Sequence, residues 1–269
     1  LAGLEAEAGH AILQTHGLTV SSEEASTLVQ HYSGNPLALQ LVAQTVQDLF
    51  AGETAAFLDA GAPIFDDIRT VLDQQYARLA PLEREILRWL AVAREPVTVQ
   101  TLRSDLVQPP PVHVLLDALR SLQRHSLLEK VDNGFTLQNV VMEYITDRLV
   151  EAVCEELEQE AGEWEGGGDA IPLLAPSLFN RHALVKAQAK DYVRQSQDRL
   201  ILQPIAQRLL ANMGQKGIEE SVNHLLTVLR AHPPLSPTYA AGNLLNLLLH
   251  LGIDLAGYDF SQLNIWNAY

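Results

Sequence analysis

The chain has 269 residues, of which 47% are hydrophobic, and its formal net charge is −15 at pH 7. This hydrophobic content excludes disorder for most of the chain, because disordered segments combine low hydrophobicity with high charge. The acidic excess argues against sequence-independent nucleic-acid binding, which needs clustered Lys and Arg. The single cysteine, Cys154, excludes a disulfide framework within the chain and fits a reducing compartment. We therefore expect a cytoplasmic protein without a membrane-spanning segment.

The charge is unevenly distributed along the chain. Residues 1–169 hold 10 basic and 27 acidic side chains, whereas residues 170–269 hold 8 and 6. The change falls at Gly166–Gly168, which follows a glutamate-rich stretch and predicts a linker. The acidic run from Glu151 to Glu160 predicts a solvated helix face rather than a metal site. Because the first residue is Leu1 rather than Met, we expect the sequence to be an internal part of a longer protein.

Residues 1–50 have the spacing of short amphipathic helices. Gly17 is expected to end the first helix, and Ser21 with Glu24 forms a capping box that opens the second. In the segment Gly34–Pro36, glycine suits the position after a helix, asparagine an N-cap and proline the first helical turn. We expect a tight hinge between two helices here, although favourable turn chemistry alone would explain the same residues.

The middle of the chain predicts helices, one extended segment and a hairpin. Asn133-Gly134 between two apolar runs is a strong hairpin signal. The expected elements are helices over 65–79, 81–90, 101–107, 112–125 and 140–157, an extended segment over 96–99, and a hairpin over 127–137. This order of elements is typical of a winged-helix module.

The last hundred residues change character twice. Four leucine-rich helices are expected over 183–192, 200–213, 219–229 and 239–251. From Ile253 the sequence repeats every five residues, with Asp or Asn second and a large apolar residue third. This period suits a square β-helix, although three repeats can also agree by chance. The predicted fold is mainly α: a small helical domain over 1–63, a winged helix over 64–162, a second helical domain over 163–252, and the start of a pentapeptide β-helix over 253–269.

Motifs for catalysis or metal binding are not found in the sequence. It contains no G-x-x-x-x-G-K-[ST], H-E-x-x-H, C-x-x-C or G-x-S-x-G pattern. The nine histidines lack ligand spacing. Cys154 lies beside Glu155 and Glu156, whose charges raise a thiol pKa and disfavour a nucleophile. We expect neither enzymatic activity nor a metal site in this chain.

The ordered set of motifs resembles the NB-ARC branch of the signal-transduction ATPases with numerous domains, or STAND proteins. Leu1–Leu4 with Ala11–Leu13 resembles the segment after that family's nucleotide-binding domain. Gly34–Leu39 resembles the GLPL motif of its small helical domain. The resemblance implies that Pro36 packs against the adenine and ribose of a nucleotide, in a binding turn formed with Gly34, Asn35 and Leu37.

The family also carries a Met-His-Asp motif at the end of its winged helix, and the histidine contacts the β-phosphate of ADP. The matching segment here is residues 136–141, in which Gln138 replaces the histidine and Asn139 the aspartate. A neutral glutamine amide can donate a hydrogen bond but cannot carry a positive charge. The resemblance therefore implies a weaker or differently tuned contact with ADP.

The order of elements is similar to that of cyanobacterial-type members that continue into pentapeptide or WD repeats. The resemblance implies a switch: an upstream P-loop domain holds ADP or ATP with Mg, and this chain closes over it. Exchange of ADP for ATP, triggered by a C-terminal repeat sensor, would expose a surface for homo-oligomerisation. Residues 52–63 and Gly166–Gly168 are the expected hinges. The parent protein would be a slow ATPase, and this part alone would not bind nucleotide tightly.

Two other functions remain open. A winged helix could bind DNA, but the expected recognition helix over 112–125 offers only Arg120 and Arg124, and its acidic surroundings repel phosphate. The chain could also be a passive interaction scaffold that needs no nucleotide.

Overall fold

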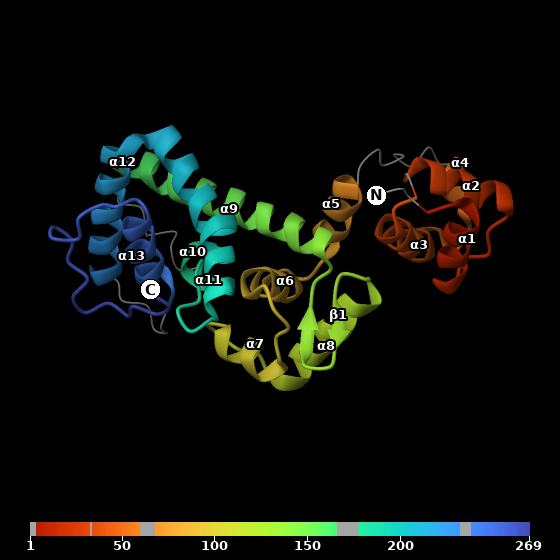
Figure 1. The fold of residues 1–269 in the computed structure, drawn as a ribbon, viewed down its shortest axis with the longest axis horizontal. Helices are drawn as coiled ribbons and strands as arrows, with labels where there is room; N and C mark the ends of the chain where they lie inside the picture. The colour runs from red at the N-terminus through yellow and green to blue at the C-terminus, as the bar shows by residue number, and fades with distance from the viewer. Residues whose placement is uncertain (1–3, 33, 60–67, 166–176, 232–237) are drawn as a thin grey trace. The chain divides into compact units, whose positions relative to one another are not determined.

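The computed structural model describes residues 4–32, 34–59, 68–165, 177–231 and 238–269 (Figure 1). The chain is mainly helical, with one two-stranded antiparallel sheet among these residues. It forms two compact units: Leu1–Arg84 with Asp117–Glu129, and Glu85–Leu116 with Lys130–Tyr269. The predicted boundary at 63/64 and the linker Gly166–Gly168 lie outside the described residues, so the division into four domains stays a prediction.

Three helices form the core of the first unit: α1 (Ala6–Thr15), α2 (Ser22–His31) and α3 (Pro36–Phe50). The predicted capping box is confirmed, because Ser21 Oγ accepts a hydrogen bond from Glu24 N (3.2 Å) and Glu24 Oε2 accepts one from Ser21 N (2.7 Å). Helix α1 packs against α2 and α3. The close approach of α1 to α2 needs Gly9, because a Cβ there would lie 2.2 Å from Cγ2 of Val29.

Two further helices complete this part of the chain: α4 (Thr54–Asp59) and α5 (Ile68–Arg78), both packed on α3. A buried hydrogen bond of 2.9 Å from Gln75 Nε2 to Thr45 Oγ1 joins α5 to α3. The segment 52–63, expected to be a hinge, thus contains a helix over 54–59, and its last four residues lie outside the described ranges.

The middle of the chain contains the predicted elements in the predicted order: α6 (Pro81–Ala93), α7 (Val99–Asp105), α8 (Val112–Arg124), β1 (Glu129–Val131) and β2 (Gly134–Thr136). The extended residue Val97 exchanges two backbone hydrogen bonds of 2.9 Å with Phe135. Only glycine fits at Gly134, because a Cβ there would lie 2.4 Å from the carbonyl oxygen of Val97. The hairpin signal in the sequence is therefore confirmed, together with a third extended segment beside it.

The rest of the second unit contains further helices, a loop and a C-terminal coil. It contains α9 (Asn139–Glu165), α10 (Leu178–Arg181), α11 (Asp191–Gln197), the π-helical turn η1 (Asp198–Leu202), α12 (Gln203–Ala231) and α13 (Ala240–His250). The two helices predicted over 200–213 and 219–229 are the two halves of α12, which bends at Gly214, where φ is +66°. Helix α9 packs against α12 and α10, and the carboxylate of Glu156 accepts hydrogen bonds from the first two N–H groups of α10.

The prediction of a helix over 183–192 is wrong. Residues 182–190, which we call the central loop, are not helical. Three of their backbone N–H groups donate to side-chain amides instead of to helical carbonyls: Leu184 to Asn243 Oδ1 (2.9 Å), Lys186 to Gln197 Oε1 (2.9 Å) and Ala187 to Asn267 Oδ1 (3.1 Å). Apolar spacing alone suggested a helix, but these distant amides satisfy the backbone in another conformation.

The C-terminal coil, residues 251–269, contains turns spaced five residues apart, at 251–252, 256–257, 261–262 and 266–267. Both Asp residues at the second position of the repeat accept a hydrogen bond from the backbone N–H two residues later in the turn. Asp254 Oδ1 accepts from Ala256 N (3.0 Å), and Asp259 Oδ1 accepts from Ser261 N (2.9 Å). The five-residue spacing of the sequence thus reappears in the backbone, although no strand is assigned within these residues.

Candidate functional site

The predicted turn Gly34–Leu37 joins α2 to α3 in the first unit. Gly34 has the expected left-handed conformation (φ +65°), and its N–H donates to Val29 O at 2.8 Å. Asn35 is the N-cap of α3: its Oδ1 accepts hydrogen bonds from Leu37 N (3.0 Å) and Ala38 N (3.2 Å). Pro36 occupies the first helical position, as predicted.

This turn leaves its proline ring exposed but offers no spare backbone N–H donor at the start of α3. Pro36 has no N–H, Asn35 Oδ1 binds the next two N–H groups, and Leu39 N donates to Asn35 O at 3.1 Å. Leu37 is buried in the core, whereas Pro36 lies on the surface. The turn can therefore present an apolar ring to a ligand, but it cannot bind a phosphate as a free helix N-terminus does.

The other two predicted site residues lie at the start of α9 in the second unit. Leu137 is buried, Gln138 is half-buried and Asn139 is exposed. Gln138 O accepts a hydrogen bond of 2.8 Å from Met142 N, so the backbone of Gln138 caps the first turn of α9. Its side-chain amide makes no hydrogen bond with another described residue. The two groups of predicted site residues thus belong to different units.

The described residues offer little for nucleophilic or metal chemistry. They contain no group of three or more His, Cys, Asp or Glu side chains that could hold a metal ion. Burial raises the pKa of the Cys154 thiol to about 11, with smaller contributions from Glu158 and Glu155. The expected direction is confirmed, but burial is the main cause rather than the neighbouring charges. Burial also lowers the pKa of His182 to about 3, so this imidazole is neutral.

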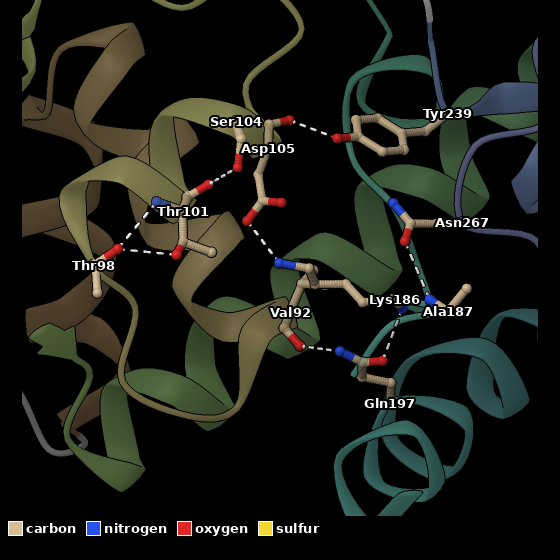
Figure 2. A network of polar contacts seen from close by, with 10 residues as sticks. All are labelled: Val92, Thr98, Thr101, Ser104, Asp105, Lys186, Ala187, Gln197, Tyr239 and Asn267. Carbon is tan, nitrogen blue, oxygen red and sulfur yellow. Dashed lines mark hydrogen bonds and ion pairs between the residues drawn. The ribbon is translucent and has the colours of Figure 1, made fainter. Parts of the chain in front are cut away.

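A network of polar contacts in the second unit joins α6 and α7 to the central loop (Figure 2). Lys186 Nζ lies 2.7 Å from Asp105 Oδ2, and the two side chains are only 17% and 12% exposed. Gln197 accepts from Lys186 N and donates from its Nε2 to the Val92 carbonyl at 2.7 Å. Burial raises the pKa of Asp105, while Lys186 opposes this shift. The network therefore keeps a buried charge pair within a set of directional hydrogen bonds.

The C-terminal coil contacts the same network through the side chain of Asn267. Asn267 Oδ1 accepts a hydrogen bond from Ala187 N (Figure 2). The backbone oxygen of Asn267 accepts another from Asn246 Nδ2 at 2.9 Å. The coil lies directly against α13, because a Cβ at Gly242 would lie 1.9 Å from the carbonyl oxygen of Trp266. A glycine within a helix usually costs stability, and Gly242 in the first turn of α13 permits this close approach.

Aromatic rings form a second connection beside the polar one. The ring centroid of Tyr239 lies 5.2 Å from that of Trp89 in α6 and 5.6 Å from that of Trp266 in the coil. The Tyr239 hydroxyl donates a hydrogen bond of 2.8 Å to the Asp105 carbonyl at the end of α7. One side chain thus contacts α6, α7 and the coil.

A pocket of about 450 Å³ lies between α11, η1, α13 and the coil. Its main charged side chains already have partners. The Arg194 guanidinium donates to the Ala187 carbonyl (3.0 Å) and lies 4.3 Å from the ring centroid of Tyr269. His250 Nδ1 lies 2.9 Å from Asp198 Oδ1. These contacts explain the position of each group without a ligand.

The sequence pointed to the turn at Pro36 and to Gln138, but it contained no motif for the network around the central loop. The partners there are 11 to 134 residues apart in the chain, and they are ordinary Asp, Lys, Gln, Asn and Tyr residues without a motif. The only usable signal was the group of uncharged amides, Gln197, Asn243 and Asn267, in an otherwise leucine-rich region.

No protein-family model matches the chain. A protein of Nostoc sp. (strain PCC 7120) named as an uncharacterized WD repeat-containing protein is 46% identical over 293 aligned residues. The match covers 100% of this chain and 23% of that protein, so the chain spans about a quarter of its relative's length. The relative's name is consistent with the expected association with WD repeats, while the NB-ARC resemblance stays a prediction. Among the described helices, none has the length and apolar character needed to cross a bilayer.

Proposed function

We propose that this chain is the regulatory part of a nucleotide-dependent signalling switch of the NB-ARC type. In this proposal it closes over ADP or ATP that a P-loop domain holds elsewhere in the parent protein, and it connects that nucleotide to a repeat region. The observation that carries the proposal is the turn at Pro36, which has an exposed ring and no spare backbone N–H group.

The chemistry of this turn suits the base and ribose rather than the phosphates. Asn35 binds the N–H groups that would otherwise attract an anion, so Pro36 can contribute only apolar contact. An adenine ring offers a flat face for such a contact, and a ribose offers C–H groups. The phosphates and their Mg would be held by the P-loop domain, which supplies the charge that this turn lacks.

Gln138 is proposed as the residue that senses the phosphate end. Its amide is half-buried and unbonded among the described residues, so it can donate to a phosphate oxygen without breaking another contact. A neutral donor attracts an anion less strongly than an imidazolium does. Gln138 would therefore hold ADP less tightly than the family's histidine, with Asn139 beside it at the exposed start of α9.

The order of the surrounding elements supports the same proposal. Helices α6 to α8, the hairpin and the extended Val97 have the order and pairing of a winged helix. The C-terminal coil has turns at the five-residue spacing of pentapeptide repeats. We propose that these parts are the winged helix and the first repeats of a cytoplasmic protein. Its nucleotide turnover would be slow, and its active form a homo-oligomer that binds neither DNA nor membrane.

The test is ADP affinity in the full-length parent protein, measured by titration with a fluorescent ADP analogue after removal of bound nucleotide. Pro36→Ala removes two methylene groups from the contact, which corresponds to about tenfold weaker binding. Pro81→Ala is the matched control, because Pro81 is likewise exposed at the first position of a helix, α6. It should leave the affinity unchanged.

Substitutions at Gln138 test the phosphate contact. Gln138→Ala should weaken ADP binding, and Gln138→His should strengthen it as the pH falls and the imidazole becomes charged. Wild-type affinity in a variant with both Pro36→Ala and Gln138→Ala would refute the proposal. A parent protein without a G-x-x-x-x-G-K-[ST] sequence upstream of Leu1 would also refute it.

A further inference from the structure

The peptide between Lys186 and Ala187 is held on both sides by parts of the chain that lie far apart in sequence. On one side, Ala187 N donates to Asn267 Oδ1 of the coil, 80 residues away. On the other, the Lys186 side chain pairs with Asp105 of α7, 81 residues away (Figure 2). A single peptide unit thus lies between the contact with the coil and the contact with α7.

Both contacts depend strongly on position. Hydrogen bonds weaken steeply when their geometry departs from a narrow range of distance and angle. A buried ion pair adds little net stability, because desolvation offsets its attraction, but it disfavours any arrangement that leaves one charge unpaired. A shift of the coil would therefore either pull the central loop with it or break these contacts.

The coil cannot shift freely against its support either. Trp266 O is in close contact with Gly242, and Asn246 binds the backbone of the coil twice: its Nδ2 donates to Asn267 O, and its Oδ1 accepts from Tyr269 N at 2.8 Å. Tyr239 provides a parallel connection, since it contacts Trp266 and donates to the Asp105 carbonyl. Packed elements of this kind move together rather than deform gradually.

We propose that the central loop is a coupling element that transmits displacement of the C-terminal coil to α7 and to the end of α6. The path runs from Asn267 through Ala187 and Lys186 to Asp105, and from Lys186 through Gln197 to the Val92 carbonyl. A load on the coil would thus reach the helices of the middle region without any ligand in the second unit. This coupling does not depend on whether the parent protein binds nucleotide.

The experiment is amide hydrogen exchange of the full-length protein, measured by mass spectrometry on peptides that cover α7 and the coil. Asn267→Gly removes the acceptor for Ala187 N, while glycine still accepts the left-handed backbone at this position (φ +55°). We expect the exchange rate of the α7 amides to rise about tenfold. The loss of one buried hydrogen bond makes local opening more favourable by about this factor. Asn267→Asp keeps an acceptor oxygen and should restore most of the protection.

Gln262→Gly is the matched control. Gln262 occupies the equivalent turn position one repeat earlier and also has a positive φ (+63°), but it makes no contact with the central loop. This variant should raise exchange in the coil alone. Exchange of α2, in the first unit, should stay constant in every variant and so show that the effects are confined to the second unit.

The reverse perturbation completes the test, because coupling between two places must act in both directions. Lys186→Met removes the charge but keeps an unbranched side chain near Trp89, and it should raise exchange in the coil about tenfold. The proposal is overturned if Asn267→Gly affects α7 no more than Gln262→Gly does. It is equally overturned if Lys186→Met leaves amide exchange in the coil unchanged. This second variant still tests the proposal if Asn267→Gly fails to fold.

Discussion

Substitution of Gly242 by alanine should have the opposite effect to the usual one for a helix interior. In an unobstructed helix, glycine to alanine stabilises by about 1 kcal/mol. Here the new Cβ would lie 1.9 Å from Trp266 O and 3.0 Å from its carbonyl carbon, so α13 and the coil would have to separate. The atoms in conflict belong to the backbone of the coil, which cannot move aside as a flexible side chain would.

The size of the effect follows from the bonds lost on separation. Three hydrogen bonds fix the coil at this point: Asn246 Nδ2 to Asn267 O, Tyr269 N to Asn246 Oδ1, and Ala187 N to Asn267 Oδ1. Each contributes about 1 kcal/mol, so their loss costs about 3 kcal/mol. The improved helix propensity offsets part of this cost. We expect a net loss of about 2 kcal/mol in the free energy of unfolding of the second unit.

Urea denaturation followed by tryptophan fluorescence is a suitable assay, because all three tryptophans, at positions 89, 164 and 266, belong to the second unit. Gly257→Ala is the control: nothing lies within 4 Å of a Cβ at that position of the same coil, so its effect should stay within about 0.5 kcal/mol. A Gly242→Ala variant more stable than the wild type would show that α13 and the coil do not approach each other as described.

Three further predictions concern single positions in the chain. Burial raises the pKa of Asp105, so its contribution to stability should fall as pH rises through the raised folded-state pKa. Urea unfolding of wild type and Asp105→Asn, measured between about pH 4 and pH 7, gives the difference in their free energies of unfolding. The advantage of the wild type should decrease as the pH rises, and an increase would contradict this prediction. With a pKa of about 11, the Cys154 thiol should resist maleimide labelling at about pH 8 until the protein is unfolded, as mass spectrometry would show; rapid native labelling would contradict its burial. Gly134→Ala places a Cβ 2.4 Å from Val97 O and should destabilise by about 2 kcal/mol in urea, whereas a neutral effect would exclude the pairing of Val97 with β2.

Local patterns in the sequence predicted most of the secondary structure. The capping box at Ser21, the N-cap at Asn35 and the hairpin before Gly134 are all confirmed, because each depends on residues a few positions apart. The same holds for the five-residue turns, whose Asp side chains bond their own backbone. These local structures are predictable because their hydrogen bonds join residues that are close in sequence, so they depend little on tertiary contacts.

Prediction failed where the backbone depends on distant side chains. Apolar spacing over 183–192 suggested a helix, but amides of Gln197, Asn243 and Asn267 bind three N–H groups of the central loop. Nothing in the local sequence reveals such partners, and tertiary contacts override local propensity here. At the candidate site, the conformation around Pro36 was predictable from the turn, whereas the half-burial of Gln138 was not.

The hydrogen bonds of the central loop have a consequence for protein synthesis. A ribosome makes a chain from its N-terminus at about 5–20 residues per second. The hydrogen bond of Ala187 N can form only after Asn267, 80 positions later, has been synthesised. The hydrogen bond of Leu184 N likewise requires Asn243, 59 positions later. For several seconds the segment is without these native partners. The central loop can therefore reach its final conformation only after α13 and the coil have been made.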